Sequence, residues 1–396
     1  GLLIYSYATG TFSSRRIECQ TYENVAVRLL CADTHPDHDS ICKFRRENKE
    51  LLVSAFHQVL ELAANARVLK VGDITVSIDG TKILASASKH SAMSYDHVEK
   101  QMKIAEEQIG ELLAKAEEAD STPLQDGLSI PEEIKRREDR IAKLKEAKKA
   151  MEERARAQLE IEQAEYEAKL AAREAREKET GRKSRSKKPG PPSPGPRPKD
   201  QYNFTDPESR IMKDGGSFEQ CYNAQAAVEV ETMLIVSNRV SDAPNDKEQM
   251  QPTLAAVSPT VGTVSAALVD SGYYSEKAVA AVEDEGRGPK VYAAMKRQSH
   301  GRSVSQLEER PDPPAPPPGA KVGEIMAHRL ETKAGRKLYG LRKQTVEPVF
   351  GIIKETLGFR RFLLRGLEKA DLEWTLVSTS YNLKRLFKLG MAIKVG

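Results

Sequence analysis

Two aspartates directly follow apolar runs that have the pattern of β-strands. Residues 75–80 read TVSIDG and residues 267–272 read ALVDSG, which puts Asp79 and Asp270 at the ends of those runs. In α/β sheets, functional side chains gather at the carboxyl ends of strands. Two carboxylates brought together there repel each other unless a cation lies between them, and oxygen ligands select a hard cation such as Mg²⁺ or Mn²⁺. The pattern indicates a divalent-metal site; the alternative for each aspartate alone is an ordinary turn residue.

A third acidic residue lies in a basic segment near the other end of the chain. Residues 339–354 read YGLRKQTVEPVFGIIK, with Glu347 and Lys354 seven residues apart. On one α-helix this spacing places both side chains on the same face. A carboxylate that holds a metal, beside an ammonium that contacts a phosphate, suits phosphate chemistry. The alternative is a surface charge pair with basic neighbours.

Pro348 complicates the geometry of this segment. Proline disfavours helical backbone at the preceding residue, but it is well tolerated in the first turn of a helix. A helix over residues 349–357 therefore either starts at Pro348 or belongs to a longer helix that kinks there. If it starts at Pro348, the argument from a shared face fails for Arg342 and Lys343. It then holds only approximately for Lys354.

The elements that must position these residues alternate between strands and helices. The spacing of apolar residues predicts helices within residues 1–70. The alternation in 73–80 predicts a strand, with 82–87 as its hairpin partner, and Trp374 is expected to pack in the core. Strands alternating with helices favour an α/β sheet. Further strands are predicted at 222–230, 234–240, 264–270 and 290–295, and further helices at 246–257, 275–284, 349–357 and 371–389.

Residues 96–180 have a different pattern, that of two long helices separated by a break rich in Pro and Gly. Apolar residues recur at alternating three- and four-residue steps, the spacing of a coiled-coil seam. We expect an antiparallel helical hairpin inserted into the α/β domain; the alternative is an isolated charged helix. A basic, Pro-rich linker follows at 181–199, and a Pro-rich loop lies at 299–320. The seam residues are Met102, Ala105, Ile109, Leu112, Ala116 and Ala119, then Ile134, Ile141, Leu144 and Met151.

Composition narrows the possible partners and compartment. The net charge is only +4, but basic residues concentrate at 182–199 and 329–354, which suits either a polyanion or a solvated charged face. No apolar run approaches the roughly 18 residues of a membrane span. The opening lacks a signal peptide and an initiator Met, so we expect sequence upstream of it. The cysteines form no C-x-x-C pair and indicate reduced thiols in the cytoplasm; they are Cys19, Cys31, Cys42 and Cys221.

Three blocks resemble the catalytic motifs of the DDE transposases of bacterial insertion sequences. They are SIDGTK around Asp79, LVDSGYYS around Asp270, and RKQTVEPVFGIIKETLGFRRFLLRG around Glu347. The amino-terminal YATGTFSSRRIE is similar to the end of that group's DNA-binding region. The resemblance implies a ribonuclease-H-like mixed sheet flanked by helices, with the two aspartates on adjacent central strands and the glutamate on a later helix. It also implies catalytic roles for all three acids.

The same resemblance implies a reaction and further site residues. Asp79, Asp270 and Glu347 would hold two Mg²⁺ or Mn²⁺ ions for DNA cleavage at transposon ends and strand transfer into target DNA. The related signature has two, three and six residues between its Tyr, Arg, Glu and Lys. Here two, four and six residues separate Tyr339, Arg342, Glu347 and Lys354, so either Arg342 or its neighbour takes the arginine role. The implied phosphate-binding residues are Tyr339, Arg342, Lys343 and Lys354.

Partners and organisation follow from the resemblance and the pattern together. The expected partner is double-stranded DNA, bound by a homodimer in a cytoplasmic, nucleoid-associated protein. Two other functions stay open: a nuclease on the same fold without strand transfer, and a decayed, non-catalytic DNA-binding relative. The expected domains are residues 1–70, the end of a truncated DNA-binding domain, 71–95 with 200–390, the catalytic domain, and 96–180, the inserted hairpin.

Overall fold

The computed structural model describes residues 1–118, 130–181, 188–295 and 311–390. The chain divides into two compact units, one of residues 1–87 and 208–396 and one of residues 88–207. Parts of the predicted hairpin, linker and Pro-rich loop lie outside the described residues, at 119–129, 182–187 and 296–310. The first of these ranges includes Ala119 of the predicted seam. No helix within the described ranges is both long enough and apolar enough to cross a membrane.

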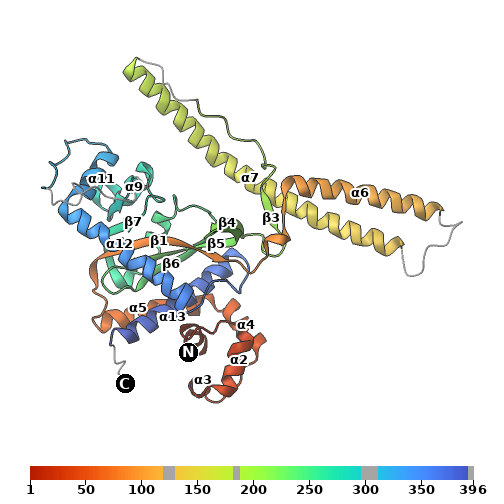
Figure 1. The fold of residues 1–396 in the computed structure, drawn as a ribbon, viewed down its shortest axis with the longest axis horizontal. Helices are drawn as coiled ribbons and strands as arrows, with labels where there is room; N and C mark the ends of the chain where they lie inside the picture. Colours follow the sequence, from red (N-terminus) through yellow and green to blue (C-terminus); the bar gives the residue numbers. More distant parts are fainter. Residues whose placement is uncertain (119–129, 182–187, 296–310, 391–396) are drawn as a thin grey trace. The chain divides into compact units, whose positions relative to one another are not determined.

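The first unit is built on a mixed six-stranded sheet, which confirms the expected α/β class (Figure 1). The strand order is β4-β5-β1-β7-β8, with β6 also paired to β5. Strand β1 is central: it pairs antiparallel with β5 and parallel with β7, and β8 continues the parallel direction. The strands are β1 Gly72–Leu84, β4 Arg210–Asp214, β5 Ser217–Glu229, β6 Ile235–Ser241, β7 Gly262–Val269 and β8 Lys290–Ala293.

Helices cover both faces of this sheet. Neighbouring side chains along a strand point to opposite faces, so the register of β1, β5 and β6 places Asp79 and Asn238 on one face, and Gly80 and Ser237 on the other. Asn238 accepts a hydrogen bond from Thr375 of α13, whereas Ser237 donates to the backbone of α8. The helices of the carboxyl-terminal half are α8 Met250–Ala255, α9 Glu276–Glu283, α11 Val322–Glu331, α12 Lys333–Gly351 and α13 Leu367–Lys388.

The first strand differs from the prediction in two ways. Strand β1 continues through Asp79 and Gly80 to Leu84, so Asp79 lies inside a strand and not at its end. The predicted hairpin partner at 82–87 is also wrong. The reason is the long neighbour β5, which pairs with β1 from Val76 as far as Leu84 and holds the Asp-Gly pair extended.

Helix α12 resolves the alternatives at Pro348. The helix begins at Lys333 and runs through Pro348 to Gly351, followed by a π-helical turn over Ile352–Thr356. A helix starting at Pro348 is therefore wrong. An interior proline costs a helix about 3 kcal/mol, but the side chains that flank it bury well in the core. These buried neighbours are Val346, Val349 and Phe350.

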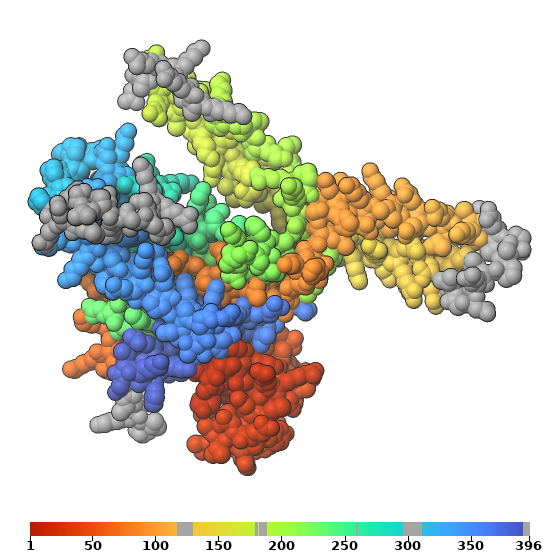
Figure 2. All heavy atoms as spheres, in the orientation of Figure 1, coloured from red at the N-terminus to blue at the C-terminus, as the bar shows by residue number. Residues whose placement is uncertain are grey.

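The amino-terminal helices belong to the same hydrophobic core as the sheet. Helices α1 and α5 pack on α13, so the amino-terminal helices lie against the last described helix (Figures 1 and 2). Trp374 of α13 is fully buried, as predicted, and its indole N–H donates to the Gln225 carbonyl. The helices are α1 Leu2–Ala8, α2 Ser14–Glu23, α3 Val25–Leu30, α4 His38–Glu47 and α5 Lys49–Asn65.

A buried ion pair joins three distant segments of this core. The Tyr7 hydroxyl donates to Glu373 Oε1 at 2.7 Å, and Arg45 donates to the Tyr7 hydroxyl at 2.6 Å. Arg45 lies 3.6 Å from Glu373 Oε1, and Glu373 Oε2 accepts the backbone N–H groups of Leu363 and Leu364 at 2.8 and 3.0 Å. Since Arg45 and Glu373 are almost completely shielded from solvent, each depends on the other for charge compensation.

The second unit contains the predicted helical hairpin. Helix α6 (Tyr95–Glu118) lies against the first part of α7 (Ile130–Thr180) (Figure 1). Of the predicted seam residues, Ala105, Ile141, Leu144 and Met151 are buried, whereas Ala116 is exposed. The polar contacts run in opposite chain directions, so the two helices are antiparallel: Tyr95–Glu152, Glu99–Lys148, Gln101–Arg140 and Gln108–Arg137.

Candidate active site

Asp79 and Asp270 are positioned by two adjacent parallel strands, β1 and β7, in the middle of the sheet. Asp79 is in β1, and Asp270 is the first residue after β7. The register pairs Ser77 with Leu268, so two further residues along each strand bring Asp79 level with Asp270. Each carboxylate is fixed locally, since Asp79 Oδ1 accepts the Gly80 N–H at 2.8 Å and Asp270 Oδ1 accepts the Gly272 N–H at 2.7 Å.

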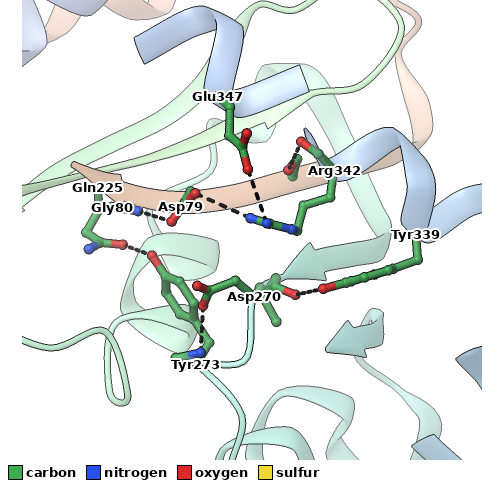
Figure 3. A network of polar contacts seen from close by, with 11 residues as sticks. Asp79, Gly80, Gln225, Asp270, Tyr273, Tyr339, Arg342 and Glu347 are labelled. Atoms are coloured by element: carbon green, nitrogen blue, oxygen red, sulfur yellow. Dashed lines mark hydrogen bonds and ion pairs between the residues drawn. The ribbon is translucent and has the colours of Figure 1, made fainter. Parts of the chain in front are cut away.

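An arginine links Glu347 to Asp79. Both acids contact the guanidinium of Arg342, which is 3.4 Å from Asp79 Oδ2 and 3.2 Å from Glu347 Oε1 (Figure 3). Helix α12 packs on the Asp79 face of β1, where the Arg342 carbonyl accepts the Ser77 hydroxyl. The side chain of Arg342 is 11% exposed and that of Asp79 19%, whereas that of Glu347 is 50% exposed. The arginine therefore lies deep in the site and the glutamate at its rim.

The environment of Asp79 opposes its ionisation. The pKa of Asp79 is raised to about 7, mainly because burial disfavours the charged carboxylate; the nearby Asp270 charge also raises this pKa, by more than the Arg342 guanidinium lowers it. The Gly80 N–H acts in the opposite direction, because it stabilises the carboxylate. A carboxyl group in this situation gains from any additional cation that reaches it.

This pKa predicts how stability depends on pH in metal-free buffer. The folded-state pKa of Asp79 lies above its unfolded value of about 3.9, so wild type loses stability relative to Asp79→Asn as pH rises between the two values. The difference should grow by on the order of 4 kcal/mol and then stay constant above about pH 7. Urea denaturation of both proteins with a chelator, at about pH 5 and about pH 8, should show roughly 3 kcal/mol of this change, because the carboxyl group of the unfolded chain is already mostly ionised at pH 5. An equal difference at both pH values would contradict the prediction.

The four predicted phosphate-binding residues occupy different environments. Arg342 is in the site, whereas Lys343 is exposed on the neighbouring position of α12. The Tyr339 hydroxyl donates to the carbonyl of Val269, next to Asp270, at 3.2 Å. Lys354 is half-buried, and its ammonium donates to the Lys82 carbonyl at 2.7 Å. Burial lowers the pKa of Lys354.

The residues fit a hard divalent cation in chemistry, although the three acids do not form one cluster. Among the residues that the structure describes, no three His, Cys, Asp or Glu side chains are close enough to hold a metal ion. However, the donors offered by Asp79, Asp270 and Glu347 are all carboxylate oxygens, the ligands that Mg²⁺ and Mn²⁺ prefer. The arginine between Asp79 and Glu347 shows that this position accepts positive charge.

Several polar residues beside the site were missed by the sequence interpretation. Asn223 and Gln225 alternate on β5 within an apolar strand, a signal that was available but not used. The predicted helix over 246–257 is wrong at its start, because α8 begins at Met250 and Asp246 precedes it. The Asp246 carboxylate instead accepts hydrogen bonds from Asn223 and Gln225, at 2.7 and 2.8 Å, and keeps its segment outside the helix.

Two family models match the chain. One, described as a transposase DDE domain, matches residues 317–387, and the other, described as a transposase domain, matches residues 1–47. The first range includes Glu347, whereas Asp79 and Asp270 lie between the two ranges. No curated protein and no solved structure matches the chain significantly.

Proposed function

We propose that this chain, which its two family matches identify as a DDE transposase of the insertion-element type, cleaves DNA at transposon ends and transfers the freed strands into target DNA. The observation that carries the proposal is that β1, the turn after β7 and helix α12 bring their acidic residues to the same side of the sheet. Asp79 lies in β1, Asp270 directly follows the parallel neighbour β7, and Arg342 contacts both Asp79 and Glu347. The family itself supports a role in transposition and the use of divalent metals.

The topology supports a ribonuclease-H-like fold as part of this proposal. The resemblance implies two aspartates on adjacent central strands and a glutamate on a later helix. In this chain Asp79 is on the central strand β1, Asp270 follows its parallel neighbour β7, and Glu347 is on α12. The same reasoning assigns residues 96–180 as an insertion into the catalytic domain, and a homodimer as the form that binds two DNA ends.

In the proposed reaction, Asp79, Asp270 and Glu347 would hold two divalent ions. When bound, such ions activate an attacking oxygen and stabilise a leaving one. In cleavage, water attacks the phosphodiester, the P–O3′ bond breaks, and a 3′-hydroxyl is freed. In strand transfer that hydroxyl attacks a target phosphodiester and displaces a second 3′-oxygen. Neither step needs a covalent bond between protein and DNA.

The chain's own residues would position the reacting groups. Arg342 is the cation nearest the acids, and its planar guanidinium can form paired hydrogen bonds with a phosphate. The Tyr339 hydroxyl donates a hydrogen bond to the carbonyl of Val269 and so stabilises the end of β7, directly before Asp270. Lys354 is anchored on the backbone of β1, where its charge would attract a phosphate that approaches this end of the strand.

The test of the proposal is an assay that follows cleavage and joining separately. Labelled duplexes that carry the element's terminal repeats are incubated with the chain, plasmid DNA, and Mg²⁺ or Mn²⁺. Nicking together with joining of 3′-ends to the plasmid is the expected result. Nicking without joining would favour the nuclease alternative, and metal-independent binding without either product would favour a non-catalytic relative.

We expect Arg342, and not Lys343, to take the arginine role in phosphate binding. Arg342→Gln should weaken DNA binding about equally for all sequences and reduce the slope of log affinity against log salt by about 1. Lys343→Gln is the matched control, because it removes one positive charge from the adjacent, exposed position. Anisotropy titrations of a labelled duplex at several salt concentrations measure both effects. A larger loss for Lys343→Gln would reverse the assignment.

A further inference from the structure

A polar network fills the space beside Gly80, on the face of β1 opposite to Asp79. A Cβ atom at Gly80 would lie 2.7 Å from Asn223 Oδ1 and from Asp246 Oδ1, and still closer to Gln225 Nε2. Contacts under 3.0 Å are essentially never made by real Cβ atoms. Only glycine at this position therefore leaves room for the three side chains. We call Asn223, Gln225, Asp246 and Tyr273 the Gly80 network.

The hydrogen bonds of the Gly80 network form a continuous path. The Tyr273 hydroxyl donates to Gln225 Oε1, and Gln225 Nε2 donates to Asp246 Oδ1 at 2.8 Å (Figure 3 shows the first of these bonds). Asn223 Nδ2 donates to the same Asp246 oxygen at 2.7 Å and to the Ala243 carbonyl at 3.2 Å. Asn223, Gln225 and Tyr273 are fully buried. Asn223 Oδ1 has no hydrogen-bond partner among the described residues, whereas the path from Tyr273 through Gln225 to Asp246 is satisfied, and satisfied buried hydrogen bonds make their surroundings rigid.

The path ends in the turn that carries Asp270. Tyr273 is three residues after Asp270, and its backbone N–H donates to the Asp270 carbonyl at 3.4 Å. Within the same turn the Gly272 N–H donates to the Asp270 carboxylate. The Tyr273 hydroxyl ties this turn to β5, which pairs directly with β1. The network thus connects the turn of Asp270 to β5, the strand that pairs with the strand of Asp79.

Charge is concentrated at the other end of the path. Lys82 Nζ is 3.9 Å from Asp246 Oδ1, and it is buried without a hydrogen-bond partner among the described residues. Lys82 and Asn223 are direct partners in the β1–β5 register. The negative charge of Asp246 is therefore balanced inside the protein, next to Gly80, and its Oδ1 is occupied by two amide donors.

We infer that Asp246, Gln225 and Tyr273 are positioning residues of the proposed active site, which fix the Asp270 turn relative to Asp79. The inference rests on the proposed function, since it assigns Asp270 to metal binding. It requires Asp246 as a hydrogen-bond acceptor for Gln225, and not as a metal ligand of its own.

The experiment measures Mn²⁺ affinity by calorimetry on the full chain, with thermal unfolding of each variant recorded in parallel. Tyr273→Phe removes one hydroxyl and should weaken Mn²⁺ binding by about three- to tenfold. Tyr274→Phe is the matched control, because this neighbouring hydroxyl lies outside the network. Asp246→Ala should weaken binding by about tenfold or more, whereas Asp246→Asn, which keeps the acceptor oxygen, should stay within about threefold of wild type.

The outcomes separate this inference from the proposed function. Equal and large losses for Asp246→Asn and Asp246→Ala would overturn the positioning role, because they would indicate direct metal ligation. Wild-type affinity in Tyr273→Phe would also overturn it, and this variant covers the case in which Asp246→Ala does not fold. The site itself is tested by Asp79→Asn: if that variant binds Mn²⁺ as wild type does, the proposed function fails.

Discussion

Asp79→Asn should abolish metal-dependent cleavage and joining of DNA by this protein. The substitution keeps the shape of the side chain, but it removes the charge that would hold a divalent ion beside Asp270. A bound metal contributes several kcal/mol to stabilising the transition state, and about 1.4 kcal/mol corresponds to a factor of ten in rate. We therefore expect a loss of about a thousandfold or more. Quantitative nicking of supercoiled plasmid with Mg²⁺ or Mn²⁺ measures it.

The matched control for this loss is Asp73→Asn, an aspartate on the same strand but distant from the site. Asp73 pairs with Thr263 at the beginning of the parallel ladder, and the same substitution there should leave nicking unchanged. Thermal unfolding of both variants shows whether they fold. Substantial metal-dependent nicking by folded Asp79→Asn would contradict the assignment of this residue, whatever its effect on DNA binding.

Glu373→Ala should destabilise the first unit by about 3–5 kcal/mol, the usual cost of leaving one member of a buried ion pair without its partner. The substitution leaves the buried Arg45 without its carboxylate. It also removes the acceptor of the Leu363 and Leu364 N–H groups and of the Tyr7 hydroxyl. Urea denaturation, followed by the fluorescence of Trp374, measures the change. Because Tyr7 and Arg45 are in the amino-terminal helices, these helices should unfold together with the sheet.

An exposed ion pair of the same helix provides the control. Glu368 pairs with Lys49 at 2.8 Å, but both side chains are more than half exposed. Exposed pairs contribute about 0–1 kcal/mol, so Glu368→Ala should shift the denaturation midpoint only slightly. If Glu373→Ala costs no more than Glu368→Ala, the buried pair does not hold the amino-terminal helices to α13.

The sequence by itself indicated most strands of the six-stranded sheet, and it proposed the three acidic positions. Apolar alternation in residues 73–78 and an apolar run in 264–269 specify strands, because the pattern reports local burial on one or both faces of a sheet. The strands at 222–230 and 234–240 were recognised in the same way and lie within one or a few residues of β5 and β6. The burial of Trp374 followed from its apolar neighbours on one helix.

The tertiary structure alone decided which basic residue joins the acids. Arg342 and Lys343 are adjacent in the chain, and no spacing rule separated them. Once α12 packs on β1, one position points into the sheet and the next points to solvent, so only Arg342 reaches Asp79. The sequence also did not decide whether the helix continues through Pro348. Burial of the neighbouring side chains outweighs the preference of proline against a helix interior, and that burial depends on the packing of α12.

The tertiary structure also decided where β1 ends and which side chains pack on its face opposite to Asp79. An Asp-Gly pair ordinarily favours a turn, but pairing with a thirteen-residue β5 keeps it extended. The Gly80 network joins β5 to the loop before α8 and to the turn after β7. The buried ion pair joins Arg45 to Glu373, two residues that are far apart in the sequence. Periodicity describes which face of an element is buried, but not which distant element covers that face. These contacts therefore appear only when the chain is folded.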